Sequence, residues 1–417
     1  MSLPGVMKNG RKGGGRVAGY LVVLPAVLLL GTGCTALRLE RPALVRESDW
    51  LTEGDSPRRG HAVDVPLNPP LDLAWTYDAG GGFGPVSPLL LGESVLVATR
   101  HGEVHGIRVA DGKKIGTQGV GEAVDGTPAV GHGLLYVPVA WGGKVLRALD
   151  LARPAEVWSL RKAPPIEAGV LLLGQTLFVA DVEGTVWALD ARTGETRWTR
   201  RLHETTGTRG GAAVLATPVA TGSDPSDPAG RVVVVDEQGR VAALRPGDGT
   251  PVWTRHLGRP VEVTPTTDGA TLFFATTRGR LLALEAATGQ VRWTFAVPDT
   301  TVRLAAPALD GRDLAVGGSD GVLRLLDAAT GQVRWTFAAP DAITAPPLLT
   351  RETIYVGTMG RMLYAVNRSD GMKTWEYRLE GRVKSAMAAR DGLLVVLAEP
   401  HAVYAFVPHT GPPAGTR

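Results

Sequence analysis

The chain is poor in cysteine: its 417 residues include only one, Cys34. A single cysteine excludes an intramolecular disulfide and a zinc site built on cysteines. A long hydrophobic run is also missing, because the apolar stretch at residues 17–30 is too short to span a bilayer comfortably and contains Pro25. The sequence has no phosphate-cradling glycine loop, no nucleophile elbow and no calcium loop with alternating acids. No familiar catalytic signature therefore points to an enzyme.

Beyond residues 1–33, the chain also lacks an excess of positive or negative charge. The formal net charge is +3, and residues 1–33 contribute four basic side chains and no acid. Without those four of the 44 basic residues, 40 basic side chains face 41 acidic ones, a net charge of about −1. A nucleic-acid-binding protein keeps a basic face. The charge balance therefore argues against nucleic acid as a partner.

The N-terminal residues have the order of a secretory signal. A basic, glycine-rich stretch at residues 1–16 precedes the apolar stretch, and small residues lead to Cys34. This order predicts a leader over residues 1–33 and a mature chain that starts at Cys34; the alternative for Cys34 is a buried free thiol. Residues 34–70 are rich in charge and proline without periodicity, and we expect a flexible tether of about 30 Å. Trp50-Leu51 is its most apolar spot and a candidate for local docking.

Most of the remaining chain is one motif repeated at intervals near forty residues. Its clearest marker is a tryptophan, found at Trp75, Trp158, Trp198, Trp253, Trp293, Trp335 and Trp375. One interval is twice the period, and Ile115 stands at its midpoint, where we expect it to replace a tryptophan. Another interval is lengthened by the loop-forming residues 221–228. A repeat of this length with a tryptophan in most copies predicts a β-propeller, with the tryptophans packing between blades.

A second marker recurs in phase with the tryptophans and gives the number of blades. Small residues and prolines occur at 87–88, 127–128, 168–169, 217–218, 264–265, 306–307, 345–346 and 385–386. Small residues fit the crowded centre of a propeller, and proline is tolerated on an edge strand. Eight markers predict eight blades; the alternative is seven blades with a degenerate first unit.

The two ends of the repeat region complement each other. In the sixth unit the strands are expected at 303–309, 313–317, 322–327 and 332–337. The last unit lacks its tryptophan strand, whereas residues 71–78 form such a strand without a unit of their own. We expect this strand to complete the eighth blade and so remove the exposed edges. The prediction is an all-β, eight-bladed propeller of four-stranded antiparallel blades over 71–407, followed by a disordered tail over 408–417.

Two sequence patterns resemble known families. The unit Gly-x-Leu-x-Ala-Leu-Asp-Ala-x-Thr-Gly-x-x-x-Trp, best matched by residues 185–198 and 322–335, resembles the PQQ-type propeller repeat. Residues 31–34 resemble a bacterial lipobox, with Gly31 at the place usually held by leucine. This resemblance implies a lipid on Cys34, and Thr35 favours sorting to the outer membrane. Leader, blade count and closing strand together resemble the BamB family, the propeller lipoproteins of the outer-membrane β-barrel assembly machinery.

The BamB resemblance implies partners and contact residues, but no cofactor. The partners would be the β-barrel assembly subunit and nascent barrel proteins, at the periplasmic face of the outer membrane. Arg209 and Gly210 match the end of the family's Leu-x-Leu-Arg-Gly contact loop, although both leucines are threonines here. Glu262, before a Thr-Pro strand, resembles the family's acidic contact loop. The alternative for Arg209 and Glu262 is ordinary solvated loop charge.

The PQQ-type repeat also occurs in quinoprotein dehydrogenases, which hold PQQ and calcium on the propeller axis. Those enzymes often carry a vicinal disulfide, which one cysteine cannot form. His101 and His105 are expected to be surface residues of one hairpin and not metal ligands. The sequence therefore predicts a non-enzymatic scaffold. The alternatives are a ligand-binding or sensory propeller in the periplasm and a lipoprotein of an unrelated envelope complex.

Overall fold

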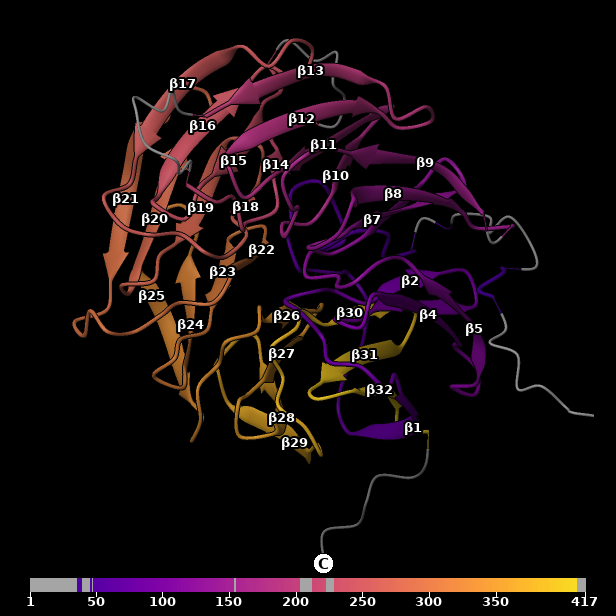
Figure 1. The fold of residues 1–417 in the computed structure, drawn as a ribbon. Coiled ribbons are helices and arrows are strands. Elements are labelled where there is room, and N and C mark those ends of the chain that lie inside the picture. Colours follow the sequence, from indigo (N-terminus) through magenta and orange to yellow (C-terminus); the bar gives the residue numbers. More distant parts are fainter. Residues whose placement is uncertain are drawn as a thin grey trace, which may run out of the picture. The chain divides into compact units, whose positions relative to one another are not determined.

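The computed structural model describes most of the chain as one β-propeller (Figure 1). The described residues are 36–39, 46, 48–153, 155–202, 212–222 and 229–410. The described residues belong to one compact unit. The predicted leader at residues 1–33 and Cys34 lie outside the described residues. The strands of the described part form eight sheets of four strands each, all antiparallel. The predicted eight-bladed all-β architecture is confirmed.

Each blade runs from a short strand at the axis to a longer strand at the rim. The innermost strands are β2 (Leu89–Leu91), β6 (Ala129–Gly131), β10 (Leu171–Leu173), β14 (Val219–Ala220), β18 (Thr266–Thr267), β22 (Ala308–Asp310), β26 (Leu348–Leu349) and β30 (Ala388–Arg390). The second strands are β3 (Ser94–Ala98), β7 (Leu134–Pro138), β11 (Thr176–Ala180), β15 (Val232–Val235), β19 (Thr271–Ala275), β23 (Asp313–Val316), β27 (Thr353–Gly357) and β31 (Leu393–Ala398). Nearly every side chain of these strands is buried, because both faces of a blade pack on neighbouring blades.

The outer half of each blade carries the repeat motif. The third strands are β4 (Glu103–Arg108), β8 (Lys144–Asp150), β12 (Thr185–Asp190), β16 (Arg240–Leu244), β20 (Arg280–Glu285), β24 (Val322–Asp327), β28 (Met362–Asn367) and β32 (Ala402–Pro408). The outermost strands are β5 (Lys114–Gly119), β9 (Glu156–Arg161), β13 (Thr196–Arg201), β17 (Pro251–His256), β21 (Val291–Ala296), β25 (Val333–Ala338), β29 (Lys373–Arg378) and β1 (Leu71–Asp78). We number the blades 1 to 8 from β2–β5 onward, so that β30, β31, β32 and β1 form blade 8.

The innermost strands are shorter than the sequence pattern indicates. In blade 6 the sequence predicts the first strand over 303–309, whereas β22 starts at Ala308. Proline at position 307 has no N–H to donate to a ladder, so regular pairing begins only after it. Before it, Leu304 makes one isolated bridge with Gly318. The small-residue marker therefore lies in the connection that enters the blade at the axis.

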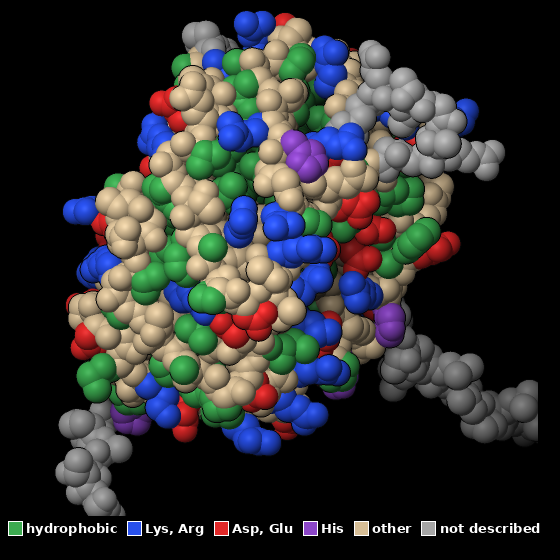
Figure 2. All heavy atoms as spheres, turned by 90° about the vertical axis from the view of Figure 1, so that its left-hand side faces the viewer, with side chains coloured by type: hydrophobic (Ala, Val, Ile, Leu, Met, Phe, Trp, Pro, Cys, Tyr) green, Lys and Arg blue, Asp and Glu red, His purple; other side chains and the backbone are tan. Residues whose placement is uncertain are grey.

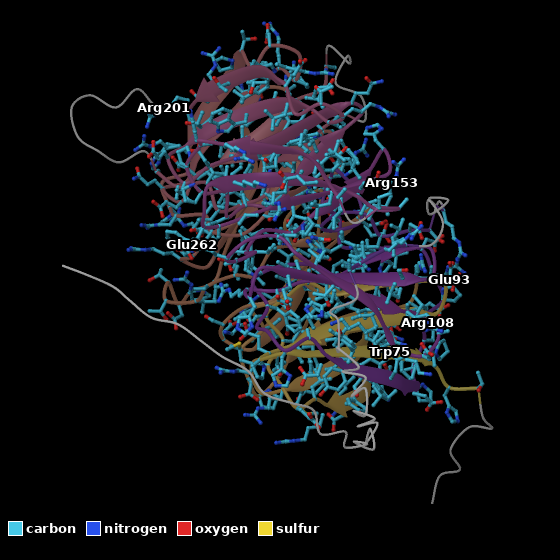
Figure 3. All side chains as sticks on the ribbon, turned by 45° about the vertical axis from the view of Figure 1, so that its right-hand side comes forward. Trp75, Glu93, Arg108, Arg153, Arg201 and Glu262 are labelled. Atoms are coloured by element: carbon cyan, nitrogen blue, oxygen red, sulfur yellow. The ribbon has the colours of Figure 1, made fainter. Side chains whose placement is uncertain are left out.

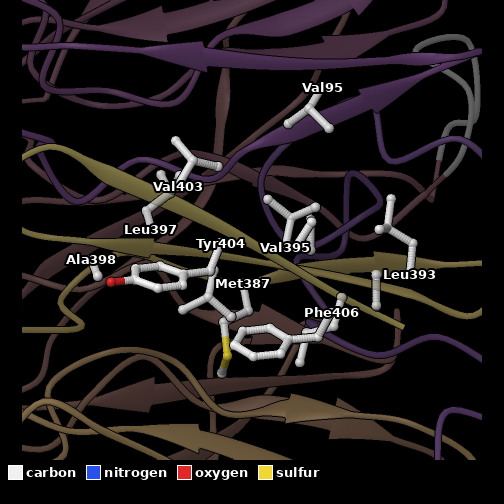
Figure 4. Packing of buried hydrophobic residues seen from close by; sticks show 14 of the residues in the cluster. Val95, Met387, Leu393, Val395, Leu397, Ala398, Val403, Tyr404 and Phe406 are labelled. Atoms are coloured by element: carbon white, nitrogen blue, oxygen red, sulfur yellow. The ribbon is translucent and has the colours of Figure 1, made fainter. Parts of the chain in front are cut away.

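The ring closes through blade 8, where the two ends of the propeller pair. Strand β1 lies antiparallel to β32, with Trp75 opposite Ala405, and its bounds are those expected from the sequence. Val95 of blade 1 and Phe406 of β32 belong to the same buried cluster (Figure 4). The innermost strand β30 also lies beside β2 of blade 1. The ladder between β1 and β32 therefore completes blade 8, and the shared core joins blade 8 to blade 1.

The repeated tryptophan links each blade to the next. The indole of Trp293 covers the turn after β24: its Nε1 donates to Ala328 O at 2.9 Å. Gly331 in that turn has φ +72°, and a Cβ there would lie 2.6 Å from the indole ring. Both the left-handed backbone and the close approach of the ring require glycine at this position. The same indole bond joins Trp75 to Val109, Trp158 to Ala191, Trp198 to Pro246, Trp253 to Ala286 and Trp335 to Arg368.

The repeat tryptophan of blade 7 contacts blade 8 through aromatic packing. Trp375 lies edge-on to Phe406 with 5.9 Å between ring centroids. Tyr377 packs against the same phenylalanine at 5.0 Å. Blade 8 has no chain turn between its third and outermost strands, because β32 and β1 come from opposite ends of the propeller. Blade 8 therefore lacks the turn whose backbone carbonyl accepts the indole hydrogen bond in the other blades.

Blade 1 departs from the repeat at the tryptophan position. In blade 5 Trp293 lies opposite Ala283, next to a bulge in the ladder. The same register in blade 1 places Gly116 opposite Gly106, also next to a bulge. The expectation that Ile115 replaces the tryptophan is therefore wrong by one residue. The replacement is a glycine, which leaves the space of an indole to be filled by another part of the chain.

Candidate functional site: the axial channel and the loop face

Residues 49–61 cross the propeller axis and fill one end of the central channel. We call these residues the axial plug. The plug bonds to all eight blades: Asp49 to Arg390, Trp50 to Leu90, Leu51 to Val130, Pro57 to Ala220, Arg58 to Thr267, Arg59 to Val170, Gly60 to Leu309 and His61 to Leu349. The expected flexible tether therefore does not describe residues 48–70, which lie hydrogen-bonded against the blades. Backbone groups at the axial edges, unpaired within their own blades, find partners in the plug.

Two opposite charges are buried within the plug. Arg59 is fully buried; its guanidinium donates to the Thr52 hydroxyl, to Glu53 O at 2.9 Å and to Val170 O at 3.0 Å. Burial lowers the pKa of Arg59 to about 10, although the neighbouring Glu53 carboxylate opposes that shift. The Glu53 carboxylate accepts a hydrogen bond from the Thr217 hydroxyl of blade 4. The pair thus ties the plug to two blades by charge-assisted hydrogen bonds.

The plug turns tightly through left-handed backbone. Gly54 has φ +62°, and a Cβ there would lie 2.7 Å from the Cα of Arg59. Asp55, Arg59 and His61 also have positive φ. His61 is buried with neither ring nitrogen hydrogen-bonded, and burial lowers its pKa to about 4. The plug is therefore a compact loop whose shape depends on a few unusual backbone positions.

The other end of the channel opens on what we call the loop face, formed by the loops that lead from the outermost strand of one blade to the first strand of the next. A cavity of about 80 Å³ lies there, with Glu53 and Thr217 among its lining residues. Asp125, Glu167 and Glu262 line it as well, against a single basic residue, Lys384. Burial and the charge of Asp125 raise the pKa of Glu167. The channel mouth is therefore small and predominantly acidic.

Of the contact residues expected from the sequence, the structure places one. Glu262 lies exposed on the loop face, lines the cavity and forms an ion pair with Arg303 of the next loop. Arg209 and Gly210 lie outside the described residues. Figure 3 shows Glu262 and Arg201 on the side of the propeller away from Glu93 and Arg108. The loop face and the face with the hairpins between first and second strands are thus opposite sides of the ring.

The loop face also exposes an aromatic residue that does not belong to the repeat. Trp141, in the connection between β7 and β8, is 56% exposed. Its neighbour Ala140 donates to Ala123 O at 2.9 Å, in the loop between blades 1 and 2, which places it on the loop face. Exposed tryptophans are enriched among residues that dominate protein interfaces. The signal was available in the sequence, because Trp141 is out of phase with the seven repeat tryptophans.

The histidine pair does not lie as expected. His101 is exposed, but His105 is buried between blades 1 and 8, with Nδ1 2.9 Å from the Tyr77 hydroxyl. The ladder explains this: His105 lies opposite Val97 of the buried strand β3. Burial is also the main reason why the pKa of His105 is lowered. The expectation of two surface histidines is therefore wrong for His105, which packs between blades.

The space on the axis does not fit a quinone cofactor. Small-molecule sites usually measure about 300–1,000 Å³, whereas the cavity at the channel mouth measures about 80 Å³ because the plug fills the axis. Across the described ranges, no three His, Cys, Asp or Glu side chains gather as metal ligands. The same residues contain no helix long and apolar enough to cross a membrane.

The rim carries many arginines, and most of them are paired. Figure 2 shows basic side chains among apolar ones on the side formed by blades 4 to 6. Arg292 Nη2 lies 3.4 Å from Glu285 Oε1, and Arg334 pairs with Asp313. Arg255 donates instead to Gly289 O at 3.0 Å. These contacts hold arginine side chains of the outermost strands against neighbouring strands and turns.

Comparison with known proteins gives the family of the chain. The family model described as outer membrane protein assembly factor BamB matches residues 142–209, 200–342 and 319–414. The outer membrane protein assembly factor BamB of Alkalilimnicola ehrlichii is 30% identical over 213 residues, 48% of this chain and 51% of that protein. The chain thus spans about half the length of this curated relative.

Solved structures with the same fold include an outer-membrane assembly factor and a quinohemoprotein dehydrogenase. The crystal structure of BamB from Moraxella catarrhalis covers 81% of this chain and 99% of its own, with a TM-score of 0.66 and 20% identity. The crystal structure of quinohemoprotein alcohol dehydrogenase from Comamonas testosteroni covers 89% of this chain and 82% of its own, with a TM-score of 0.71 and 14% identity. Identities this low show a shared fold only. The family match, which extends over more than half of the sequence, shows that the chain belongs to the BamB family of outer membrane protein assembly factors.

Proposed function

We propose that this protein is a non-enzymatic scaffold of outer-membrane β-barrel assembly, anchored to the periplasmic face of the outer membrane by a lipid on Cys34. It binds an assembly subunit, and nascent barrel proteins, through its loop face. Family membership supports the assembly role. The observation that carries the scaffold role is the axial plug, which bonds to all eight blades. An enzyme of this fold uses its axis as the active site, whereas here the chain itself occupies that space.

The loop face supplies the features of a binding surface. Trp141 offers exposed aromatic area, and Glu262 with the acidic channel mouth offers charge of one sign. An aromatic anchor beside polar residues is the usual composition of an interface hot spot and its rim. We therefore place the contact with the assembly subunit on this face.

Affinity purification from native membranes tests the proposal. The tagged full-length protein, extracted in mild detergent, is expected to recover β-barrel assembly components. Trp141→Ala and Glu262→Lys should each reduce recovery several-fold. Val157→Ala and Glu195→Lys serve as matched controls, because both residues are exposed away from the loop face. Failure to recover any assembly component, or equal losses in the controls, would contradict the proposal.

The likeness to quinohemoprotein dehydrogenases motivates a second candidate, a ligand-binding or sensory propeller. Such a protein would have to use the acidic cavity at the channel mouth. Thermal-shift measurements with PQQ, calcium and sugars distinguish the two candidates. We expect no shift of the unfolding temperature with any of them; a saturable shift with PQQ would favour the dehydrogenase class instead.

A further inference from the structure

Blade 1 contains a slot where the other blades carry the linking tryptophan. Gly106 and Gly116 face each other across β4 and β5. A Cβ on Gly116 would lie 2.7 Å from the Cα of Leu37, and one on Gly106 would overlap the Leu37 side chain. Glycines at these two positions therefore leave room for another segment, and that segment is the start of the described chain.

Residues 36–39 fill this slot and take over the contacts of the missing indole. Ala36 forms a parallel bridge with Thr117 of β5, and Leu37 N donates to Thr117 O at 3.1 Å. Leu37 and Leu39 are buried, and Leu39 N donates to Leu151 O at 3.0 Å. Leu151 follows Asp150 in the turn of blade 2, just as Ala191 follows Asp190 in the turn of blade 3 that accepts the Trp158 indole. A backbone N–H thus donates where an indole N–H does so between other blades.

The docked segment starts two residues after the predicted lipid site. Two residues of extended chain span at most about 7 Å. A lipid on Cys34 would consequently hold Ala36, and with it the outer strand of blade 1, next to the membrane. A flexible tether of 37 residues would leave the orientation of the propeller free, but a chain that is docked at residues 36–39 does not.

The surroundings of the slot are basic. The exposed basic residues around the slot are Arg38, Arg108, Lys113, Lys114 and Arg153. The acidic residues beside them are Asp111 and Asp150. Asp111 lies 3.4 Å from Arg108 and 3.5 Å from Lys113, and Asp150 lies 3.9 Å from Arg153. Three positive charges remain in excess. A basic cluster beside an acyl chain is the combination that binds anionic lipid surfaces stably.

We propose that the rim of blade 1, defined by residues 36–39 docked on β5 and by these five basic residues, is the membrane-facing surface of the protein, and that it lies against anionic lipid headgroups. The proposal rests on the proposed lipid anchor at Cys34. It fixes the orientation of the propeller: Arg108 and Arg153 lie away from Glu262 in Figure 3, so the loop face stays clear of the lipid and accessible to the assembly subunit.

Site-specific quenching in vesicles tests this orientation. Acylation consumes the single native cysteine, so a second cysteine can be labelled alone with a fluorophore. Lys114→Cys on β5 and Val291→Cys on β21 occupy equivalent, exposed positions of blades 1 and 5. In vesicles of phosphatidylethanolamine and phosphatidylglycerol with nitroxide headgroups, we expect several-fold stronger quenching at position 114. Equal quenching at the two positions, or stronger quenching at 291, would overturn the proposal.

A second variant separates docking from anchoring. Leu39→Asp buries a charge in the slot and should release the segment while the acyl chain stays in place, as checked by mass spectrometry. The quenching difference between positions 114 and 291 should then disappear; its persistence would show that the docked segment does not set the orientation. A mature protein without an acyl chain on Cys34 would also overturn the inference. Recovery of assembly components by affinity purification is independent of these outcomes and tests the proposed function separately.

Discussion

At the scale of single residues, the stability of the plug depends on one buried cation. Arg59→Met keeps the volume of the side chain but removes its hydrogen bonds to the Thr52 hydroxyl, Glu53 O and Val170 O. Leaving buried partners of this kind unsatisfied costs about 1–3 kcal/mol for each of them. Arg58→Met is the matched control, because Arg58 is exposed and joins the blades through its backbone carbonyl. We expect the control to stay within about 0.5 kcal/mol of the native protein in urea unfolding; equal losses for both variants would contradict this account.

A second residue of the plug destabilises the fold at neutral pH. Burial raises the pKa of Asp55 to about 6, so between the ordinary carboxyl pKa and this value the folded protein holds a proton that the unfolded chain releases. The carboxylate therefore costs stability above pH 6, and that cost fades as the pH falls toward 4. Asp55→Asn removes the charge, and asparagine tolerates the positive φ of 72° at this position.

We expect Asp55→Asn to raise the free energy of unfolding by about 1–2 kcal/mol at pH 7.5 and by almost nothing at pH 4. The expected gain is smaller than the free energy that corresponds to the full pKa shift, because the Asp55 side chain is partly exposed. Urea titrations at the two pH values measure the difference. A gain that is the same at both values would mean that the charge is not its cause.

At the scale of elements, the slot in blade 1 can be closed with a single methyl group. Gly116→Ala places a Cβ 2.7 Å from Ala36 O and Leu37 Cα, so the docked segment has to move. Gly119→Ala lies on the same strand with nothing within 4 Å and is the matched control. We expect trypsin to cleave after the exposed Arg38 several-fold faster in Gly116→Ala only, as followed by mass spectrometry. Unchanged cleavage in Gly116→Ala would contradict the docked position of residues 36–39.

The strands were predictable from the sequence because their contacts are periodic. Six of the seven repeat tryptophans, all but Trp375, meet the same glycine turn of the next blade. Spacing near forty residues therefore carries the information for Trp158, Trp293 and the others. The plug contacts each blade through a different residue, and no periodicity marks it. Its contacts join positions as distant as Asp49 and Arg390. The one sequence signal for docking was Trp50-Leu51, the most apolar spot of the segment.

The candidate site was less predictable than the fold. Glu262 was singled out through family resemblance and lies exposed on the loop face. The acidic mouth around Glu53 could not be foreseen, because its lining residues come from loops of many blades brought together only by ring closure. The two glycines of the slot, Gly106 and Gly116, look like ordinary turn or strand glycines in sequence. Their role appears only when Leu37 is seen to fill the space above them.

At the scale of the whole molecule, closure and plugging are separable. A chain starting at Pro70 keeps β1 but lacks the plug, whereas a chain starting at Ala79 lacks both. Without β1 the edge of β32 is exposed, and exposed edges associate with other chains. We expect the chain from Ala79 to form oligomers or aggregates in light scattering, and the chain from Pro70 to remain monomeric but less stable. A monomeric chain from Ala79 would show that β1 does not protect the ring.

The central claim is that the segment before the first blade is an integral part of the propeller, both in the slot of blade 1 and on the axis. Amide hydrogen exchange of the mature, full-length protein tests it most directly, because the amides of Leu37, Leu39 and Trp50 each donate to a blade. We predict that peptides covering 36–39 and 49–61 exchange as slowly as those of the innermost strands. Complete exchange of these peptides within seconds, with the blades still protected, would contradict the claim.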